Sequence, residues 1–136
     1  MAANKAPIFV DTPNVKIGTT LTTANTAKDG TGTVVLAFEA GADGAYCDVI
    51  RLKPLGTNVQ SVVRAFVNNG SDPTTATNNA LCWEQTLPAT TLSETGSLAE
   101  IEIPIGKMLP AGYRIYLAIG TTVSAGWIPV GFGGDY

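Results

Sequence analysis

The amino-acid sequence predicts an all-β domain, an antiparallel sandwich or barrel of about eight or nine strands. Three observations support this fold class. Segments in which apolar and polar residues alternate recur at intervals of roughly 8–14 residues. Turns rich in Gly, Pro and Asn separate them, and no long amphipathic helix lies between them, which argues against a parallel α/β sheet. A chain of 136 residues corresponds to one domain.

The expected strands follow one another along the chain. They cover residues 6–10, 15–23, 33–40, 45–56, 58–70, 80–91, 98–106, 113–120 and 127–132. Turn signals separate several of them, at Asp29-Gly30, Asp43-Gly44 and Asn69-Gly70. The best helical candidate, residues 74–87, is weakened by its Thr and Asn residues and by Pro88. A strand that is kinked or placed at a sheet edge by Pro88 is the preferred interpretation there.

The N-terminal residues 1–13 are expected to form an extended arm in front of a single β-sandwich domain, residues 14–136. Pro7 and Pro13 each restrict the preceding residue to extended backbone. The N-terminus has no apolar run of about 7–15 residues that would mark a signal peptide, so synthesis and folding in a cytoplasm are expected. No run approaches the roughly 18 apolar residues of a membrane span, so we expect no membrane partner.

The strand expected at 45–56 alternates clearly between two faces. Tyr46 and Asp48 share a face with Ile50 and Leu52. Asp48 is therefore the acidic residue most expected to be partly buried, either paired with an arginine or at a strand end near solvent. A structural role is favoured for it over a catalytic one.

The strand expected at 98–106 places three isoleucines inward and two carboxylates outward. Glu100 and Glu102 share a face, with Cβ atoms about 6.5–7 Å apart. Two carboxylates at such a separation could serve a glycoside hydrolase. Because Ile101, Ile103 and Ile105 take the inner face, a solvated outer face is the preferred interpretation.

The chain ends "GFGGDY" (131–136), just after an apolar run. Alternation places Ile128, Val130 and Phe132 on one face, so the last strand is expected to reach Phe132. The glycines that follow permit bends or close backbone approach. We therefore expect a terminus anchored to the sheet, with Asp135 and Tyr136 docked on a neighbour or on their own fold.

The charge pattern excludes one class of partner. The net charge is −3, the pI is about 4.7, and the basic residues are scattered. Nucleic-acid-binding domains usually carry a basic stripe or a pI above about 9. We therefore expect no nucleic-acid partner.

Composition also restricts the chemistry. The chain has no histidine, which removes Ser-His-Asp and Cys-His catalysis and the commonest metal ligand. Cys47 and Cys82 lie in apolar runs and are expected to be buried free thiols, although a disulfide could form in a secreted chain. We expect no enzyme activity, metal or cofactor.

The two tryptophans leave alternatives open. A tryptophan in a strand usually belongs to the core, but Trp83 or Trp127 could also stack on a sugar. Trp127 could instead anchor a protein interface, where this residue type is enriched.

Four segments carry a resemblance to a known family. They are "TANTAKDGTGT" (23–33), "FEAGADGAYCDVIRLKPLGT" (38–57), "LPAGYRIYLAIGTT" (109–122) and "GFGGDY" (131–136). In this order they resemble a family of small tailed-bacteriophage and prophage proteins, over most of the chain after residue 20 except 58–97. The resemblance implies a virion protein, a jelly-roll cement (head decoration) protein on the capsid exterior.

Further expectations follow from this resemblance. The implied partner is the major capsid protein, and the chain would be a homo-oligomer, a dimer or trimer, made in the host cytoplasm. Alternatives are a carbohydrate-binding or tail-associated β-sandwich module and, less favoured, a small carboxylate hydrolase. The residues expected to contact a partner are Pro7, Ile8, Phe9, Pro13, Trp127, Phe132 and Tyr136.

Overall fold

The computed structural model of the chain describes residues 9–136. Within them the chain forms eight strands and one short 3-10 turn, Ala76–Asn78. The strands are β1 (Thr12–Ile17), β2 (Val35–Glu39), β3 (Ala45–Pro54), β4 (Ser61–Asn68), β5 (Asn79–Leu87), β6 (Ile101–Leu109), β7 (Arg114–Ile119) and β8 (Trp127–Asp135).

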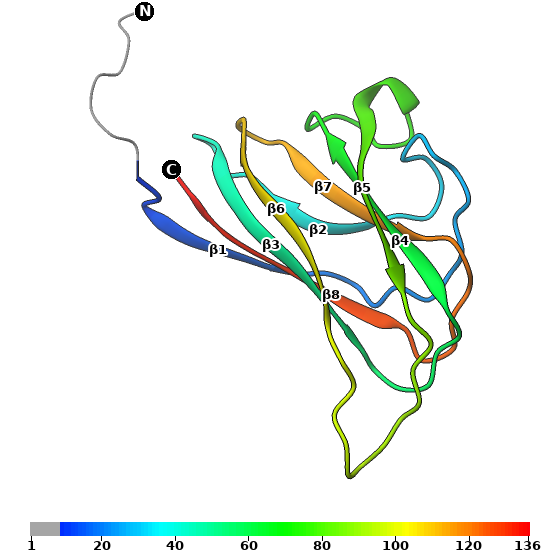
Figure 1. Cartoon of the computed structure of the whole chain (residues 1–136). Helices are drawn as coiled ribbons and strands as arrows, with labels where there is room; N and C mark the ends of the chain where they lie inside the picture. The colour runs from blue at the N-terminus through cyan, green and yellow to red at the C-terminus, as the bar shows by residue number, and fades with distance from the viewer. Residues whose placement is uncertain (1–8) are drawn as a thin grey trace, which may run out of the picture.

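The eight strands form two four-stranded antiparallel sheets packed face to face (Figure 1). The strand order is β1-β8-β3-β6 in sheet A and β2-β7-β4-β5 in sheet B. The first half of the chain therefore pairs with the second in reverse, β1 with β8, β2 with β7, β3 with β6 and β4 with β5. This order is that of a jelly roll, so the predicted all-β, jelly-roll-like sandwich is confirmed.

The core fills the space between the two sheets. Strand alternation directs every second side chain into this layer, and its largest members are almost fully buried. They include Phe38, Ile50, Leu52, Ile115, Leu117 and Trp127. Trp127 is thus a core residue, one of the three interpretations of its position that the sequence allowed.

A bulge in β3 overturns the predicted burial of Asp48. The pairing register shifts between Cys47 and Val49 against both neighbouring strands. The extra residue reverses the alternation, so that Cys47 points inward, as Ile50 does, while Tyr46 and Val49 face outward. Asp48 is the bulged residue, and it is exposed.

The two cysteines differ, which corrects the expectation that both are buried. Cys47 lies in the core, and burial raises the pKa of its thiol to about 12. Cys82 is exposed on β5, which lies at the edge of sheet B. Both thiols are free.

The C-terminal strand is anchored more firmly than the sequence indicated. β8 runs to Asp135 and lies between β1 and β3. A Cβ atom on Gly131 would overlap the carbonyl oxygen of Ala37 in the opposite sheet, so this close approach requires glycine. Tyr136 continues the anchoring, because its backbone N–H donates a hydrogen bond to the Gly44 carbonyl.

Several element boundaries differ from those expected. Part of the strand expected at 6–10 lies outside the described residues, and Phe9 and Val10 are not in a strand. The strand expected at 15–23 is β1, which already begins at Thr12 and ends at Ile17. The strand expected at 98–106 is β6, which begins only at Ile101 and continues to Leu109.

The connections differ in where they run. Residues 18–21 continue beside β8, where the backbone of Gly18 and Leu21 is hydrogen-bonded to Pro129 and Trp127. From Asn25 the connection passes over the outside of sheet B before β2 begins, at the right of Figure 1.

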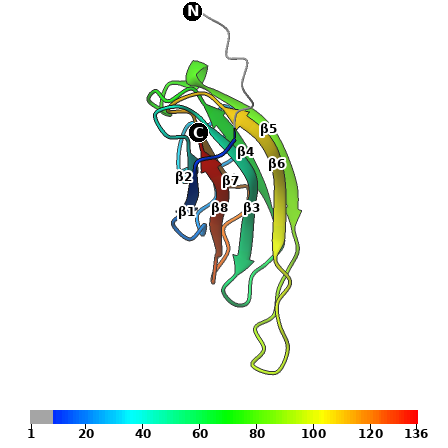
Figure 2. The ribbon, with the colours of Figure 1, turned by 90° about the vertical axis from the view of Figure 1, so that its left-hand side faces the viewer.

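Residues 88–100 form a long loop that extends beyond one end of the sandwich in both views (Figures 1 and 2). Asn58 connects the segments at this end of the sandwich. Its side-chain oxygen accepts hydrogen bonds from the backbone N–H groups of Ala125 and Gly126, and its side-chain nitrogen donates to the Gly126 carbonyl.

Candidate interaction surfaces

The described residues contain no group of three or more His, Cys, Asp or Glu side chains that could hold a metal ion. In residues 9–136 no helix is long and apolar enough to cross a membrane. The surface of the described residues carries charged and apolar groups, which are the candidate interaction sites.

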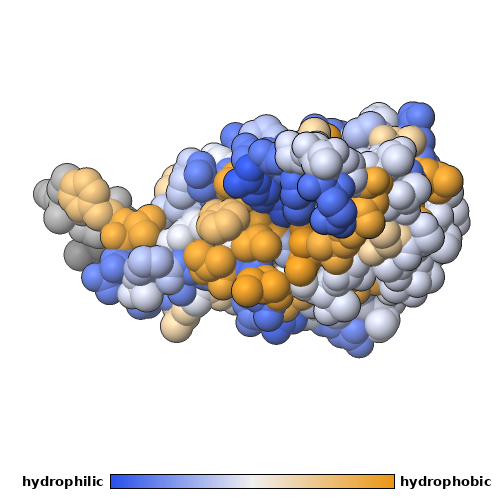
Figure 3. All heavy atoms as spheres, turned by 90° about the horizontal axis from the view of Figure 1, so that it is seen from below, coloured by the Kyte–Doolittle hydropathy of each residue, from blue (hydrophilic) through white to orange (hydrophobic). Residues whose placement is uncertain are grey.

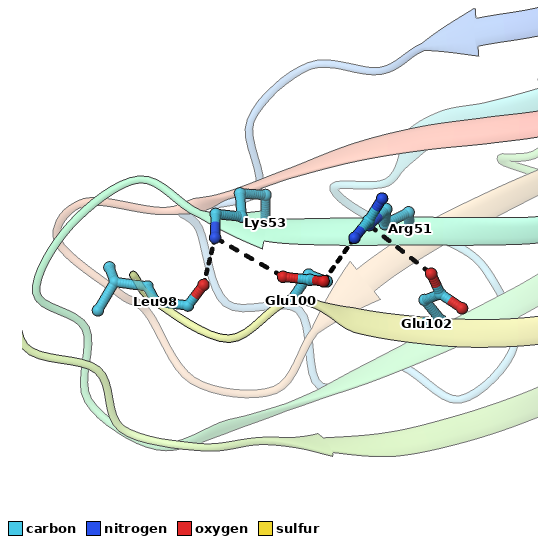
Figure 4. Close-up of polar contacts among 5 residues, drawn as sticks. All are labelled: Arg51, Lys53, Leu98, Glu100 and Glu102. Atoms are coloured by element: carbon cyan, nitrogen blue, oxygen red, sulfur yellow. Dashed lines mark hydrogen bonds and ion pairs between the residues drawn. The ribbon is translucent and has the colours of Figure 1, made fainter. Parts of the chain in front are cut away.

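Glu100 and Glu102, the carboxylates weighed as a hydrolase pair, lie on the outer face of sheet A among basic side chains (Figure 4). Arg51 Nη2 lies 2.5 Å from Glu100 Oε1, and Arg51 Nε lies 3.7 Å from Glu102 Oε1. Lys53 Nζ lies 3.7 Å from the other oxygen of Glu100 and donates a hydrogen bond to the Leu98 carbonyl. These four side chains balance one another; we call them the charged cluster.

Hydrogen bonds to the ionised form set the protonation of Glu100. A backbone hydrogen bond and then Arg51 lower the pKa of its carboxyl group. A carboxyl group with a lowered pKa is a poor proton donor near neutral pH. Glu100 and Glu102 are therefore ion-pair partners of Arg51 and Lys53 on a strand face that is open to solvent.

Beside the charged cluster, the outer face of sheet A is apolar. Residues opposite one another on neighbouring strands share a face, and the pairing registers align apolar side chains in rows across the sheet. One row runs Val15, Phe132, Val49, Pro104, and the next begins Ile17, Val130. On the other side lies the row Pro13, Gly134, Tyr46, Met108.

We call these side chains the apolar face; its members are Pro13, Val15, Ile17, Tyr46, Val49, Pro104, Met108, Val130 and Phe132. All are at least partly exposed, with Ile17 and Met108 69% and 73% exposed. Figure 2 views sheet A with its four strands side by side, and Figure 3 shows apolar atoms gathered on the lower side of the molecule, bordered by hydrophilic ones. Contiguous apolar surface of this kind marks an interaction site more often than chance exposure does.

The apolar face continues past the edge of the sheet. Val10 lies over Gly134, where a Cβ atom would overlap its side chain. Phe9, next to it, is largely exposed.

A second group of exposed apolar side chains lies at the end of the sandwich near the long loop. Leu55, Val59 and Leu92 are each about half exposed, and we call them the apolar end. They are held near one another because the Leu92 N–H donates to Thr57 Oγ1 and Asn58 pairs with Thr90. Leu55 follows the end of β3, so the charged cluster lies between the apolar end and the apolar face.

A third feature is an open groove of about 520 Å3 between β5 and the β6–β7 turn. Trp83 and Tyr113, both partly buried, contribute the aromatic rings, and Met108 and Lys107 line its other side. Of the two tryptophans, Trp83 is the one with a surface that a ligand could reach.

The predicted contact residues are dispersed. Pro7 and Ile8 lie outside the described residues. Phe9, Pro13 and Phe132 lie on or beside the apolar face. Trp127 is buried in the core and therefore presents no surface to a partner, and Tyr136 is half-buried against its own fold.

Sequence reasoning missed Val15, Ile17 and Met108 as exposed surface. A signal for the apolar face existed in "WIPVGF" (127–132), where apolar residues occupy both faces of one strand. Such a strand is typically covered on both sides. In β8 the inner face belongs to the core, and the outer face is left open.

Comparisons with known proteins do not add a family to these observations. No family model, no curated protein and no solved structure matches this chain.

Proposed function

We propose that this protein is a structural virion protein, a capsid cement or decoration protein that binds the outside of the assembled phage head and stabilises it. The observation that carries the proposal is the presence of two separate apolar surfaces, the apolar face and the apolar end, on one small domain. A protein that bridges others needs at least two contact surfaces, and the side chains of both are apolar apart from the Tyr46 hydroxyl.

The mechanism is thermodynamic. A protein that binds only the assembled shell stabilises it by mass action, as any ligand stabilises the state that it prefers. The major capsid protein is proposed as the partner because of the sequence resemblance to phage proteins. The two apolar surfaces support a protein as the partner.

One observation favours a second candidate, a carbohydrate-binding or tail-associated module. The groove beside Trp83 and Tyr113 combines two aromatic rings with Lys107. Aromatic faces stack on apolar sugar faces, so glycan retention that is lost in a Trp83→Ala variant would support this candidate.

Mass spectrometry of separated heads and tails tests the proposed function. We expect stoichiometric copies on purified heads and a lower melting temperature of heads from which the protein has been removed. If the protein is found only in tails, the cement function is wrong.

A variant at the apolar end tests the surface. Val59→Glu should reduce binding to heads about tenfold or more, because it places a charge in an apolar contact. Leu81→Glu is the matched control, since Leu81 is an exposed apolar residue outside both surfaces. Equal binding of both variants would exclude the apolar end as the contact.

A further inference from the structure

We propose that the apolar face of sheet A binds a second copy of this chain, so that two sandwiches pack face to face about a two-fold axis. This inference rests on the proposed function only for the use of the pair on the shell. The pair itself follows from four properties of the face: its side chains, its charges, the arrangement of its apolar and charged parts, and its size.

The side chains of the apolar face match those of an inner layer. Val15, Ile17, Val49, Val130 and Phe132 are the β-branched and aromatic types that fill the space between two packed sheets. Each sheet of this protein already covers such a layer on its inner side. A second sheet placed on the outer side would bury the apolar face in the same manner.

Most of the charged groups near the apolar face are paired. In the charged cluster two basic side chains pair with two acidic ones. Asp48 in the bulge is exposed and adds one negative charge, whereas Lys107 lies opposite the inward-pointing Cys47, on the other side of β6. The chain as a whole carries a net charge of −3, so two copies repel one another only weakly.

The arrangement also suits a two-fold contact. In such a contact the same patch serves both partners, so an apolar patch faces itself and finds complementary chemistry. The charged cluster lies to one side of the face and would remain at the rim, where charged residues stay hydrated. An apolar centre with a polar rim is the usual anatomy of a protein interface.

The size of the face is sufficient for the centre of a standard interface. Four strands and three rows of side chains cover roughly 20 Å by 20 Å, about 400 Å2 of sheet. A standard interface buries about 800 Å2 on each partner, of which the centre is the apolar part. The exposed Phe9 and Val10 extend the apolar area beyond the edge of β1.

Sedimentation of two matched variants tests the inference. Val15 and Val59 are 55% and 57% exposed, Val15 on the apolar face and Val59 on the apolar end. We expect the wild-type chain, of 14.1 kDa, to sediment as a dimer at tens of micromolar and to dissociate on dilution. Val15→Glu should weaken dimerisation about 100-fold or more, because it places two carboxylates in one apolar contact, whereas Val59→Glu should not change it.

Each outcome decides the inference. A wild-type chain that remains monomeric at the highest concentration overturns it, and so does a dimer that Val59→Glu breaks and Val15→Glu does not. If Val15→Glu does not fold, Ile17→Lys on the same strand replaces it, with a circular dichroism melt as the test of folding. Binding to heads is measured separately, so a monomer found on heads refutes the dimer alone, and a dimer absent from heads refutes the cement function alone.

Discussion

The outer faces of the two sheets differ in whether another segment of the chain covers them. On sheet B, Phe66 pairs with Tyr116 and is fully buried although it lies outside the cluster between the sheets. On sheet A, Phe132 pairs with Val15 and Val49 and is 38% exposed. Both phenylalanines point away from the core, and the difference is whether another part of the chain covers them.

The cover on sheet B is the connection between β1 and β2. The Asn25 N–H donates to the Ile119 carbonyl at β7, and Asn79 Nδ2, at the start of β5, donates to the Asp29 carbonyl. Residues 25–29 therefore cross β4, which lies between β7 and β5. No described segment is held across sheet A by comparable hydrogen bonds, so its apolar side chains remain available to another molecule.

The largest expected difference between the two faces is in their contribution to stability. Phe66→Ala should lower the free energy of unfolding by about 3–5 kcal/mol, because it leaves a cavity under the covering segment. Phe132→Ala should lower it by about 1 kcal/mol or less in the monomer, because the site is already open to solvent. Urea denaturation at submicromolar concentration measures both, and equal losses would contradict the contrast.

A smaller effect is expected from loosening the cover. Asn79 Nδ2 donates to the carbonyls of Asp29 and Pro73, and Asn68 donates to Asn79 Oδ1. Asn79→Ala should cost about 1–3 kcal/mol, because partly buried polar groups lose their partners. Thermal denaturation measures the loss, and unchanged hydrogen exchange in residues 25–31 of the variant would show that Asn79 does not hold the cover.

The smallest effect is expected at the charged cluster. The lowered pKa of Glu100 means that its ionised form is favoured in the folded state. Its contribution is therefore present above the ordinary value of 4.5 and is lost as the pH falls through the lowered pKa. Glu100→Gln should change the melting temperature little at neutral pH, since the group is exposed, and should flatten its fall below pH 4.5.

Other carboxylates also contribute to the loss of stability at low pH. Hydrogen bonds from Thr31 and Thr74 lower the pKa values of Asp29 and Asp72, so the variant keeps part of its acid sensitivity. A profile of Glu100→Gln that coincides with that of the wild type below pH 4.5 would show that the ion pairs add nothing to stability.

The fold class could be predicted from the sequence because alternation and turn residues act locally. Ile103 and Ile105 are buried and Glu102 is exposed, as the pattern of β6 indicates. The burial of Asp48 was predicted wrongly because one bulged residue reverses the alternation of β3, and no local signal marks the bulge.

The candidate surfaces could be predicted only in part, because coverage of a sheet is a property of the whole topology. The sequence shows that Val15 and Ile17 are apolar, but only the path of the chain shows that nothing in residues 9–136 covers them. The burial of Cys82 was predicted wrongly for a related reason, because an edge strand such as β5 leaves apolar positions exposed.

The central claim is that the outer face of sheet A is a protein interface and that of sheet B is not. Amide hydrogen exchange of the wild-type chain, compared between about 1 and 100 µM, tests it most directly, since these concentrations span typical dissociation constants of weak complexes. We expect protection of residues 12–17 to rise with concentration and protection of residues 25–31 to stay constant. Unchanged exchange in residues 12–17 across this range, or a rise confined to residues 25–31, would contradict the account.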